Sequence, residues 1–303
     1  MAQRAARRAA TALLAAAAIL AALLAAVPAQ AGTSTSGFCD KPSHIDASRQ
    51  DRLLRFAAVV KQELARAGHG AALISRTGTD LARFGIRYSH AGIALADNPA
   101  GPWAVRQLYY ACDESRARLF DQGISGFMLG ADDPSHGYVS LLLLPEAQGQ
   151  TLAAAALDKR QALALLSADY SANAYAWSTR YQNCNQWVME MIADAWGNAD
   201  GAPQPREAAQ QWLRAQGYQP ETIDVGARWL VIAAHFTPLV HVRDHPIEDL
   251  RALQMQVSMP ASIEQFVRQQ VPQSRRIELC YDTRHIVVRR DGPPLAESCQ
   301  PEA

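Results

Sequence analysis

Lysine is scarce in this chain of 303 residues, occurring only at Lys41, Lys61 and Lys159. The sequence contains no cluster of lysine and arginine, and its 29 basic residues balance 29 acidic ones. Nucleic-acid-binding proteins usually carry a basic patch or stripe, so this composition excludes that class. Beyond its first 31 residues the chain also lacks an internal repeat and any apolar run long enough to span a bilayer. We therefore expect one domain with a substantial core, with or without an extension.

The N-terminal segment, residues 1–31, has the pattern of a secretion signal. Arginines near the N-terminus precede an alanine- and leucine-rich run from Ala9 to Val27. Pro28–Ala31 then supplies the small residues of a cleavage site, and we expect cleavage before Gly32. An uncleaved membrane anchor is the alternative because the run is long, but its alanine content makes it weakly hydrophobic. No lipobox cysteine follows the run, which argues against a lipoprotein. The sequence therefore predicts a periplasmic or secreted protein.

The cysteine count is odd, with 5 in the chain. In an exported protein, an odd count leaves one thiol free or joined to another molecule. We expect Cys280 to pair with Cys299, because these two residues flank a pair of C-terminal strands, and Cys39 to pair with Cys112. Other pairings of the same cysteines are possible from the sequence alone. The expected pairing leaves Cys184 as the free thiol.

The apolar periodicity predicts helices and strands that do not alternate along the chain as they do in βαβ units. Helical spacing and end signals predict helices over 49–67, 152–175, 184–197, 205–217 and 262–270. Short apolar or alternating runs predict strands over 71–75, 88–95, 103–110, 138–144, 229–234, 277–281 and 286–289. This mixture indicates an α+β fold in which an antiparallel sheet packs against helices.

Cys184 lies at the start of the helix predicted over 184–197. Asn183 can cap this helix, and apolar residues at helical spacing follow until Gly197. The unpaired N–H groups and the dipole of a helix N-terminus lower the pKa of a thiol placed there. The same N–H groups can hold the oxyanion that forms when a thiolate attacks a carbonyl. The alternative is a buried cysteine that packs as a small apolar residue.

His90 and Gln107 are the candidates for the other parts of a nucleophilic site. His90 begins a predicted strand, where its side chain can face a helix N-terminus packed on the same sheet. A histidine on a strand more often has a structural role, and a catalytic base needs a third group that orients its ring. Gln107 lies on the next predicted strand, and antiparallel pairing would bring it beside His90.

An ordered set of short motifs resembles a known superfamily. The stretch Ser89–Ile93, a polar residue on the following strand, and Asn183–Val188 at a helix start are similar to the circularly permuted papain-like superfamily. This group includes the permuted NlpC/P60 proteins and the lecithin:retinol acyltransferase-like enzymes, and in it histidine precedes cysteine. The resemblance covers mainly residues 85–196.

The resemblance implies a role for each candidate residue. Cys184 would be the nucleophile, His90 the base and Gln107 the residue that orients the base. Gln107 departs from the histidine or glutamate that is more usual at this point, and an amide can hold the ring but cannot stabilise an imidazolium by charge. The implied organisation is a signal peptide over 1–31, a loose arm over 32–47, a permuted papain-like catalytic core over 48–235 and a C-terminal extension over 236–303.

A wider resemblance spans nearly all of the mature chain. The stretches Arg87–Gly92, Tyr181–Asn185, Asp244–Pro246 and Pro260–Glu264 are similar to an uncharacterised bacterial family, domain of unknown function 2145. The family name carries no function, so the resemblance gives an expected relationship and no activity.

Three other groups of residues are further candidates for a functional role. His136 is a rival base, but it lies in a turn before a strand. A metal could be bound by His235, His241 and His245 together with Asp244. Their segment is not predicted to be helical, however, so the spacing of the histidines does not indicate that they face one metal ion. We expect instead a turn that hydrogen-bonds itself through Asp244 and His245. The aromatic side chains near Cys184 are more easily explained by core packing than by an acyl pocket; these are Trp177, Trp187 and Trp196.

The sequence therefore predicts an exported cysteine hydrolase or acyltransferase that attacks an amide or ester. Expected partners are a peptide, lipid or peptidoglycan-derived substrate, with no nucleic acid and no transmembrane segment after signal cleavage. No metal or organic cofactor is needed. The alternative is a non-catalytic periplasmic protein that uses the same scaffold for binding or structure.

Overall fold

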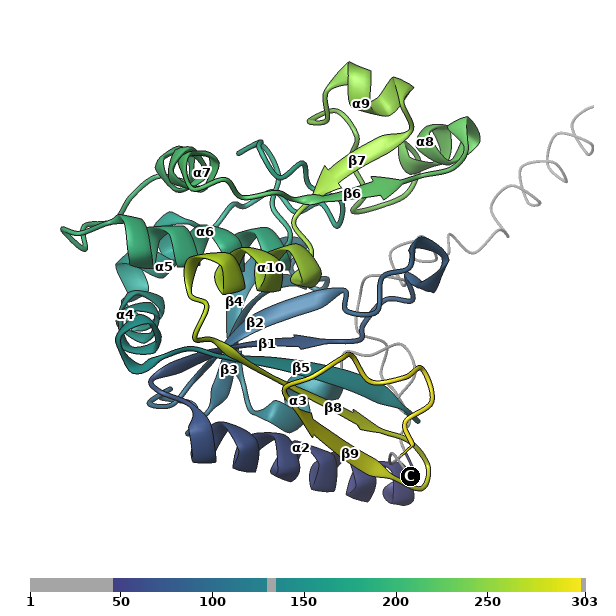
Figure 1. Cartoon of the computed structure of the whole chain (residues 1–303). Coiled ribbons are helices and arrows are strands. Elements are labelled where there is room, and N and C mark those ends of the chain that lie inside the picture. Colours follow the sequence, from purple (N-terminus) through teal and green to yellow (C-terminus); the bar gives the residue numbers. More distant parts are fainter. Residues whose placement is uncertain (1–45, 130–134, 301–303) are drawn as a thin grey trace, which may run out of the picture.

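The computed structural model describes residues 46–129 and 135–300. The predicted signal peptide, nearly all of the predicted arm and Cys39 lie outside these residues. The described chain has an α+β architecture in which an antiparallel sheet packs against helices on both faces (Figure 1). This confirms the fold class expected from the mixture of helical and strand periodicities.

Seven strands of the described residues form the main sheet, in the order β4-β3-β2-β1-β5-β8-β9. Every neighbouring pair in this sheet for which a register is defined is antiparallel. In chain order the strands are β1 (Ala71–Arg76), β2 (His90–Leu95), β3 (Ala104–Ala111), β4 (Arg116–Gln122), β5 (Gly137–Leu143), β8 (Arg275–Tyr281) and β9 (Ile286–Arg290). A short 3₁₀ helix, η1 (Ala82–Phe84), lies between β1 and β2.

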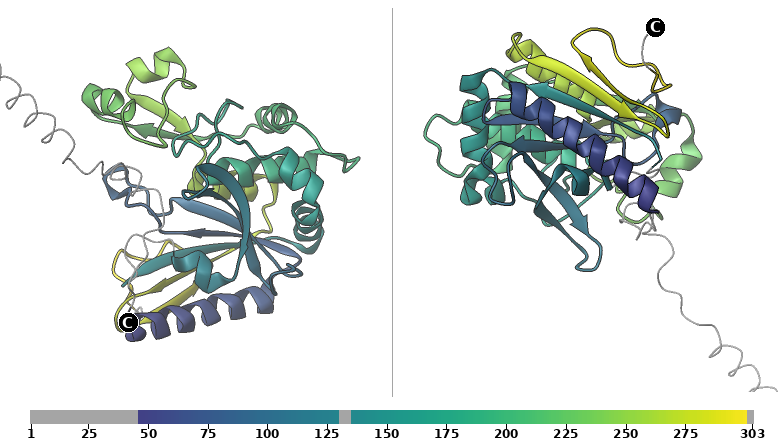
Figure 2. Two further views of the ribbon diagram at one scale, coloured as in Figure 1. Left: turned by 180° about the vertical axis from the view of Figure 1, so that it is seen from behind. Right: turned by 90° about the horizontal axis from the view of Figure 1, so that it is seen from below.

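Helices cover both faces of the sheet (Figures 1 and 2). One face packs on α2 (Ala47–Ala67) and α3 (Ile124–Leu129). The opposite face packs on a larger group, which consists of α4 (Glu146–Leu157), α5 (Lys159–Ala164), α6 (Cys184–Gly197), α7 (Arg206–Ala215) and α10 (Pro260–Gln270). Both faces of the central strands are therefore buried, which explains why the sequences of these strands are nearly continuous apolar runs.

Strand β2 shows how alternation divides the core. Ala91, Ile93 and Leu95 belong to the cluster on the α6 side, whereas Ala94 belongs to the cluster on the α2 side. Successive side chains of a strand point to opposite faces, so this division follows directly from the sequence of the strand. It brings the first residues of β2 under the N-terminal end of α6.

A smaller unit projects from this body. Its sheet pairs β6 (Glu221–Asp224) with β7 (Gln254–Val257), and the helices α8 (Arg228–Ala234) and α9 (Ile247–Arg251) lie beside it (Figure 1). The unit has a core of its own, which includes Val242, Met255 and Val257.

Two predicted elements differ from the structure. The strand expected over 229–234 is the helix α8, because a short apolar run does not by itself distinguish a strand from a helix. The long helix expected over 152–175 is instead α4 and α5, which are joined at Asp158. Asp158 caps α5 by accepting hydrogen bonds from the N–H groups of Arg160 and Gln161. Residues 165–183 then follow an irregular path up to Cys184.

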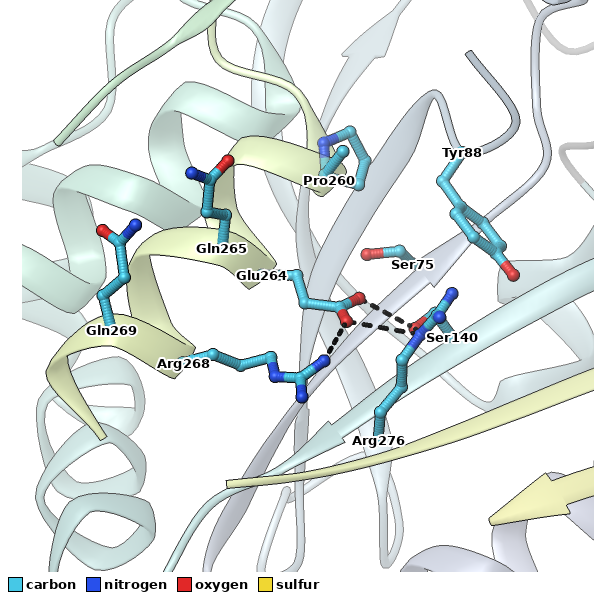
Figure 3. Close-up of a pocket in the computed structure, with 10 residues that line it drawn as sticks. Ser75, Tyr88, Ser140, Pro260, Glu264, Gln265, Arg268, Gln269 and Arg276 are labelled. Atoms are coloured by element: carbon cyan, nitrogen blue, oxygen red, sulfur yellow. Dashed lines mark hydrogen bonds and ion pairs between the residues drawn. The ribbon is translucent and has the colours of Figure 1, made fainter. Parts of the chain in front are cut away.

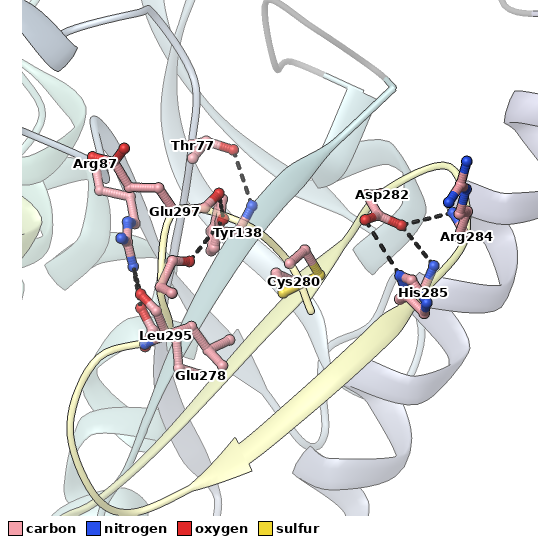
Figure 4. Close-up of a disulfide and its surroundings, with 12 residues drawn as sticks. Thr77, Arg87, Tyr138, Glu278, Cys280, Asp282, Arg284, His285, Leu295 and Glu297 are labelled. Carbon is pink, nitrogen blue, oxygen red and sulfur yellow. Dashed lines mark hydrogen bonds and ion pairs between the residues drawn. A yellow bond between two sulfur atoms is a disulfide. The ribbon is translucent and has the colours of Figure 1, made fainter. Parts of the chain in front are cut away.

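The C-terminal segment completes the main sheet through β8 and β9, so residues beyond 236 contribute strands to the same layer as β1 and β5. A disulfide joins Cys280 to Cys299, and this confirms the predicted pair (Figure 4). Tyr138 donates a hydrogen bond to the carbonyl of Ala296, and Arg87 donates one of 2.7 Å to the carbonyl of Leu295. The tail is thereby held against β5.

Cys112 also takes part in a disulfide, while Cys39, its predicted partner, lies outside the described residues. Cys184 is a free and buried thiol, as expected from the odd cysteine count. Within the described ranges, no helix is both long enough and apolar enough to cross a membrane.

Replacing both Cys280 and Cys299 with serine is expected to lower the free energy of unfolding by about 3 kcal/mol, because the bridge closes a loop with a sequence separation of 19. Urea unfolding without reductant measures the change. The variant Cys184→Ala, which removes a thiol that forms no bridge, serves as the control. A loss no larger than that of the control would contradict the structural role of this disulfide.

Candidate active site

The N-terminus of α6 is capped by Asn183, whose backbone is extended and whose side chain accepts a 2.8 Å hydrogen bond from the N–H of Gln186. This satisfies one of the N–H groups that a helix start leaves without a partner. Cys184 is the first residue of the helix, as the sequence predicted, and its side chain is only 5% exposed. Because α6 packs on β2 and β3, the thiol is directed into the sheet.

The backbone N–H groups of Ala91, Asn185 and Cys184 itself act to lower the pKa of the Cys184 thiol. The thiol also contacts Oδ1 of Asn185 at 3.6 Å. Burial raises the pKa of the thiol to about 11, although the N–H groups and the charge of Arg76 act in the opposite direction. The sequence predicted a lowered pKa at this helix start, and the structure shows the reverse because burial outweighs the helix N-terminus. Cys184 is therefore a neutral thiol at pH 7.

His90 begins β2 and is hydrogen-bonded through Nε2 to Oε1 of Gln107 on β3. The amide nitrogen of Gln107 in turn donates a 2.6 Å hydrogen bond to Oε1 of Gln122 on β4. Since this second bond fixes the amide, Gln107 presents its oxygen to His90, and Nε2 must carry the proton. The lone pair of the imidazole is consequently on Nδ1.

Electrostatics keep the His90 ring neutral. Burial and the nearby positive charge of Arg76 lower the pKa of His90 to about 3, against the opposing effect of the Gln107 hydrogen bond. The ring also lies 5.6 Å from that of Phe127 on α3. At pH 7 the imidazole is thus in its basic form and carries no charge.

The β2–β3 ladder ends before His90 and Gln107, at the pair Ile93 and Arg106. A Cβ on Gly92 would lie 2.4 Å from a methyl group of Val105, so only glycine allows β3 to approach β2 this closely. The structure therefore brings His90 and Gln107 together as the sequence predicted.

His90 and Cys184 are neighbours through Ala91, the residue that follows His90 and whose N–H acts on the thiol. In the described residues no hydrogen bond joins the thiol to the imidazole. Catalytic hydrogen bonds often form only when substrate is bound, so this geometry is compatible with either a resting enzyme or a non-catalytic site.

Two further residues belong to this site and were missed from the sequence. Arg76 ends β1 as the register partner of His90, is 5% exposed, and lowers the pKa of both His90 and Cys184. Arg76 could have been identified from the sequence, because it is a charged residue at the end of an apolar strand. Tyr170 lies near Cys184, and burial together with the Cys184 and Tyr109 charges raises its pKa. No sequence pattern marked Tyr170, because it lies in the irregular segment before α6.

A buried ion pair holds that irregular segment. Glu190, which is fully buried on α6, accepts hydrogen bonds from Arg206, Gln182 and Gln210. Arg206 also donates to the carbonyl groups of Thr179 and Tyr181. The network therefore fixes the chain immediately before Cys184.

The histidine-rich segment supports the same region from the small unit. The expected turn is present, since the N–H of His245 donates to the carbonyl of Val242 at 3.3 Å, but the side chains of Asp244 and His245 bond outside it. Asp244 accepts a 2.9 Å hydrogen bond from the N–H of Tyr175, and His245 bonds to the carbonyl of Asn173 at 2.8 Å. The ring of His241 stacks on Tyr181, and the ring of His235 bonds to the carbonyl of Val231. Among the described residues, no group of three or more His, Cys, Asp and Glu side chains could hold a metal ion.

His136, the rival base, precedes β5 and contacts the hydroxyl of Ser135 at 3.5 Å. The tryptophans near Cys184 pack in or against the core on the α6 side of the sheet. Trp187 is completely buried and donates a hydrogen bond to the carbonyl of Ala162, so it fills the core.

A pocket of about 510 Å³ lies between α10 and the strands β1, β5 and β8 (Figure 3). The side chain of Asn185 lies near this pocket, since it donates to the carbonyl of Ser89 at 3.2 Å and contacts the sulfur of Met259 at 3.8 Å. Tyr88 and Pro260, which adjoin Ser89 and Met259 in the sequence, line this pocket. Its other lining residues are mostly polar and include Ser75, Ser140, Glu264, Arg268 and Arg276. Ser75 is the register partner of Ala91, but Cys184, His90 and Gln107 do not line the pocket.

These features define an α+β protein with an antiparallel sheet, a disulfide and a buried free thiol at a helix start. The chain belongs to the bacterial family described as "Uncharacterized protein conserved in bacteria (DUF2145)", whose pattern matches residues 63–267. This confirms the family expected from the sequence. No curated protein and no solved structure matches the chain.

Proposed function

We propose that the protein is an exported cysteine hydrolase or acyltransferase of permuted papain-like architecture. It acts on an amide or ester of the cell envelope, such as a peptide, a lipid or a peptidoglycan stem. The observation that carries the proposal is the position of Cys184 as the first residue of α6, a helix start whose backbone N–H groups act on the thiol. The order of histidine before cysteine and the His90–Gln107 bond add support.

The reaction starts from a neutral thiol and a neutral imidazole. Nδ1 of His90 removes the thiol proton as the sulfur attacks the carbonyl carbon, and the carbonyl oxygen takes the negative charge. N–H groups at the start of α6 stabilise this oxyanion. The carbon–nitrogen or carbon–oxygen bond then breaks, and the leaving group receives the proton from His90. Water or an amine attacks the resulting thioester, which releases the acyl group and restores the thiol.

The pocket between α10 and the strands β1, β5 and β8 is assigned to a distal part of the substrate, since Cys184, His90 and Gln107 do not line it. Its walls combine the apolar Pro260 with hydroxyl, amide and charged groups, and it starts at Ser75 next to the strand that carries His90. Gln107 holds the base in one orientation and one tautomer. It adds no charge to stabilise the imidazolium that forms when the proton moves, and the lowered pKa of His90 makes the free imidazole a weak base.

A non-catalytic binding protein on the same scaffold is the second candidate. The observation that favours it is the burial of Cys184 together with the absence, among the described side chains, of a hydrogen bond from the thiol to His90. In this reading the pocket binds its ligand and the thiol has a packing role.

Acylation by p-nitrophenyl acetate separates the two candidates. The enzyme is expected to gain one acetyl group on Cys184, detected by intact mass and peptide mapping, and to release nitrophenol beyond one equivalent as the thioester turns over. Faster release with an added amine would identify acyl transfer. Cys184→Ala should show neither the adduct nor the release. Equal release by this variant and the native protein would favour the binding protein.

A further inference from the structure

A polar row crosses the main sheet beneath the pocket at α10. The strand registers align Ser75 on β1 with Ser140 on β5, and Ser140 with Glu278 on β8. Register partners and residues two apart along a strand share one face of a sheet. In the next row on this face, Leu73 is aligned with Leu142, and both belong to the core that includes α6. The apolar core of this face therefore gives way to polar residues at the serine row, where the pocket lies (Figure 3).

The same row extends from the pocket toward Cys184. Ser75 is aligned with Ala91 on β2, and Ala91 and Cys184 belong to one core cluster. Neighbouring strands lie about 4.8 Å apart, so Ser140, two strands away from Ala91, is separated from it by about 10 Å. An extended peptide of about three residues spans this distance. A substrate that reacts at Cys184 would therefore reach the pocket with a group about three residues from the bond that breaks.

The charged side chains of the pocket have an excess of one positive charge. Arg268 on α10 and Arg276 on β8 line it together with Glu264, whose carboxylate lies between the two guanidinium groups at 3.6 Å and 3.3 Å (Figure 3). Beneath them, the buried carboxylate of Glu278 is paired with Arg87 at 3.2 Å and with Arg276 at 3.0 Å. The two layers together contain three arginines and two glutamates, so a bound monoanion would balance the charge.

Both arginines of the pocket keep N–H donors for a ligand. A guanidinium has five such donors. Arg276 binds the surrounding acceptors through Nε and Nη2, and within the described residues its Nη1 forms no hydrogen bond. Arg268 is 56% exposed and forms no hydrogen bond to any other described residue. Two parallel hydrogen bonds from a planar guanidinium match a carboxylate, whereas a doubly charged phosphate would exceed the positive charge and be repelled by Glu264.

We propose that this pocket binds a carboxylate of the substrate, held by Arg268 and Arg276 about three residues from the bond that Cys184 attacks. The inference rests on the proposed function and adds a substrate class to it, namely peptide-like amides or esters that carry a carboxylate at this distance. Gln265 and Gln269 line the same wall of α10 and offer amide groups to the peptide part. Arg268 is then a specificity-determining residue.

Binding of a matched pair of peptides tests the need for charge. N-acetyl-trialanine ends in a carboxylate, and its C-terminal amide lacks only that charge. NMR titration of Cys184→Ala, which has no thiol to react, should give a Kd for the acid about tenfold lower than for the amide, the effect of one charge-assisted contact. Arg268→Gln in the same background should remove most of this difference, and added salt should reduce it.

Arg275→Gln is the matched control. Arg275 precedes Arg276 on β8, is 57% exposed, and pairs with Asp291 rather than with a residue of the pocket. This variant should keep the full difference between acid and amide. Circular dichroism verifies that each variant is folded.

Inhibition links the pocket to the thiol. In the native protein the acid should inhibit nitrophenol release from p-nitrophenyl acetate, and the amide should require about a tenfold higher concentration. Equal Kd values for acid and amide, or a difference that survives Arg268→Gln, would overturn the carboxylate site. Binding of the acid without inhibition would overturn its assignment to the substrate. If no release depends on Cys184, the proposed function fails, while the Kd values still decide whether the pocket binds a carboxylate.

Discussion

Replacing His90 with alanine is expected to slow the acylation of Cys184 at neutral pH by about 10²- to 10⁴-fold, the range typical of a lost general base. The reason is that burial raises the pKa of the thiol to about 11, so very little thiolate exists at pH 7 unless a base removes the proton. Stopped-flow measurement of nitrophenol release, with the adduct located by mass spectrometry, gives the rate for each variant.

The pH profile of the same reaction gives a second test. The pKa of His90 is lowered to about 3 and that of Cys184 raised to about 11, so base and protonated thiol coexist throughout the neutral range. The native rate should therefore be nearly flat from about pH 4 to about pH 10. In His90→Ala the rate should follow the thiolate alone and rise about tenfold per pH unit toward the thiol pKa.

Matched variants identify which histidine and which contact matter. His136→Ala removes the rival base and should leave the rate unchanged. Gln107→Ala should lower the rate, because the ring loses its partner and its fixed tautomer, while Gln107→Glu keeps an acceptor for Nε2. A slow His136 variant, or a His90 variant with the native pH profile, would be inconsistent with the assigned base.

Replacing Arg206 with methionine is expected to lower the free energy of unfolding by about 3–5 kcal/mol, the cost of leaving a buried charge without its partner. Glu190 is fully buried, and burial already raises its pKa in spite of Arg206. Without the guanidinium the carboxylate keeps only the amide donors Gln182 and Gln210. Urea unfolding measures the loss, which should shrink as the pH falls because protonation removes the unpaired charge.

Arg214→Met is the control for this prediction, since Arg214 lies on the same helix but is exposed and rests on the ring of Trp177. Arg214→Met should lower the free energy of unfolding far less than Arg206→Met does. Adding Glu190→Gln to Arg206→Met should recover part of the loss, because the buried charge is then absent. If Arg206→Met lowered the free energy of unfolding no more than Arg214→Met does, the ion pair would contribute little to stability.

Local signals made the core of the site predictable. Asn183, the apolar spacing after Cys184 and Gly197 together specify where α6 begins and ends, and each acts within a few residues. His90 and Gln107 could be placed near each other from the sequence because they lie on adjacent antiparallel strands, although continuing the register of these strands puts Gln107 opposite Gly92 and the side chains bond diagonally. The Cys280–Cys299 bridge followed from two neighbouring strands that end close together.

Other features depend on packing between distant segments, which a single sequence does not reveal. The pKa of the Cys184 thiol depends on how deeply α6 buries it. The helix dipole alone predicts a lowered pKa, whereas burial raises it. Arg206 lies 16 residues from Glu190, and their pairing requires α7 to lie against α6. The helix α8 could not be distinguished from a strand, because its six apolar residues fit either state until the β6–β7 sheet is placed beside them.

The raised thiol pKa of Cys184 also bears on oxidative folding. Thiol–disulfide exchange requires a thiolate, and the attack slows as the thiolate fraction falls. Once α6 has packed on the sheet, Cys184 is a poor attacking group for the bridge at Cys280 or the one at Cys112. Burial of the odd cysteine thus protects the correct disulfides from shuffling, and it does so at the same position where bound substrate would have to reach the sulfur.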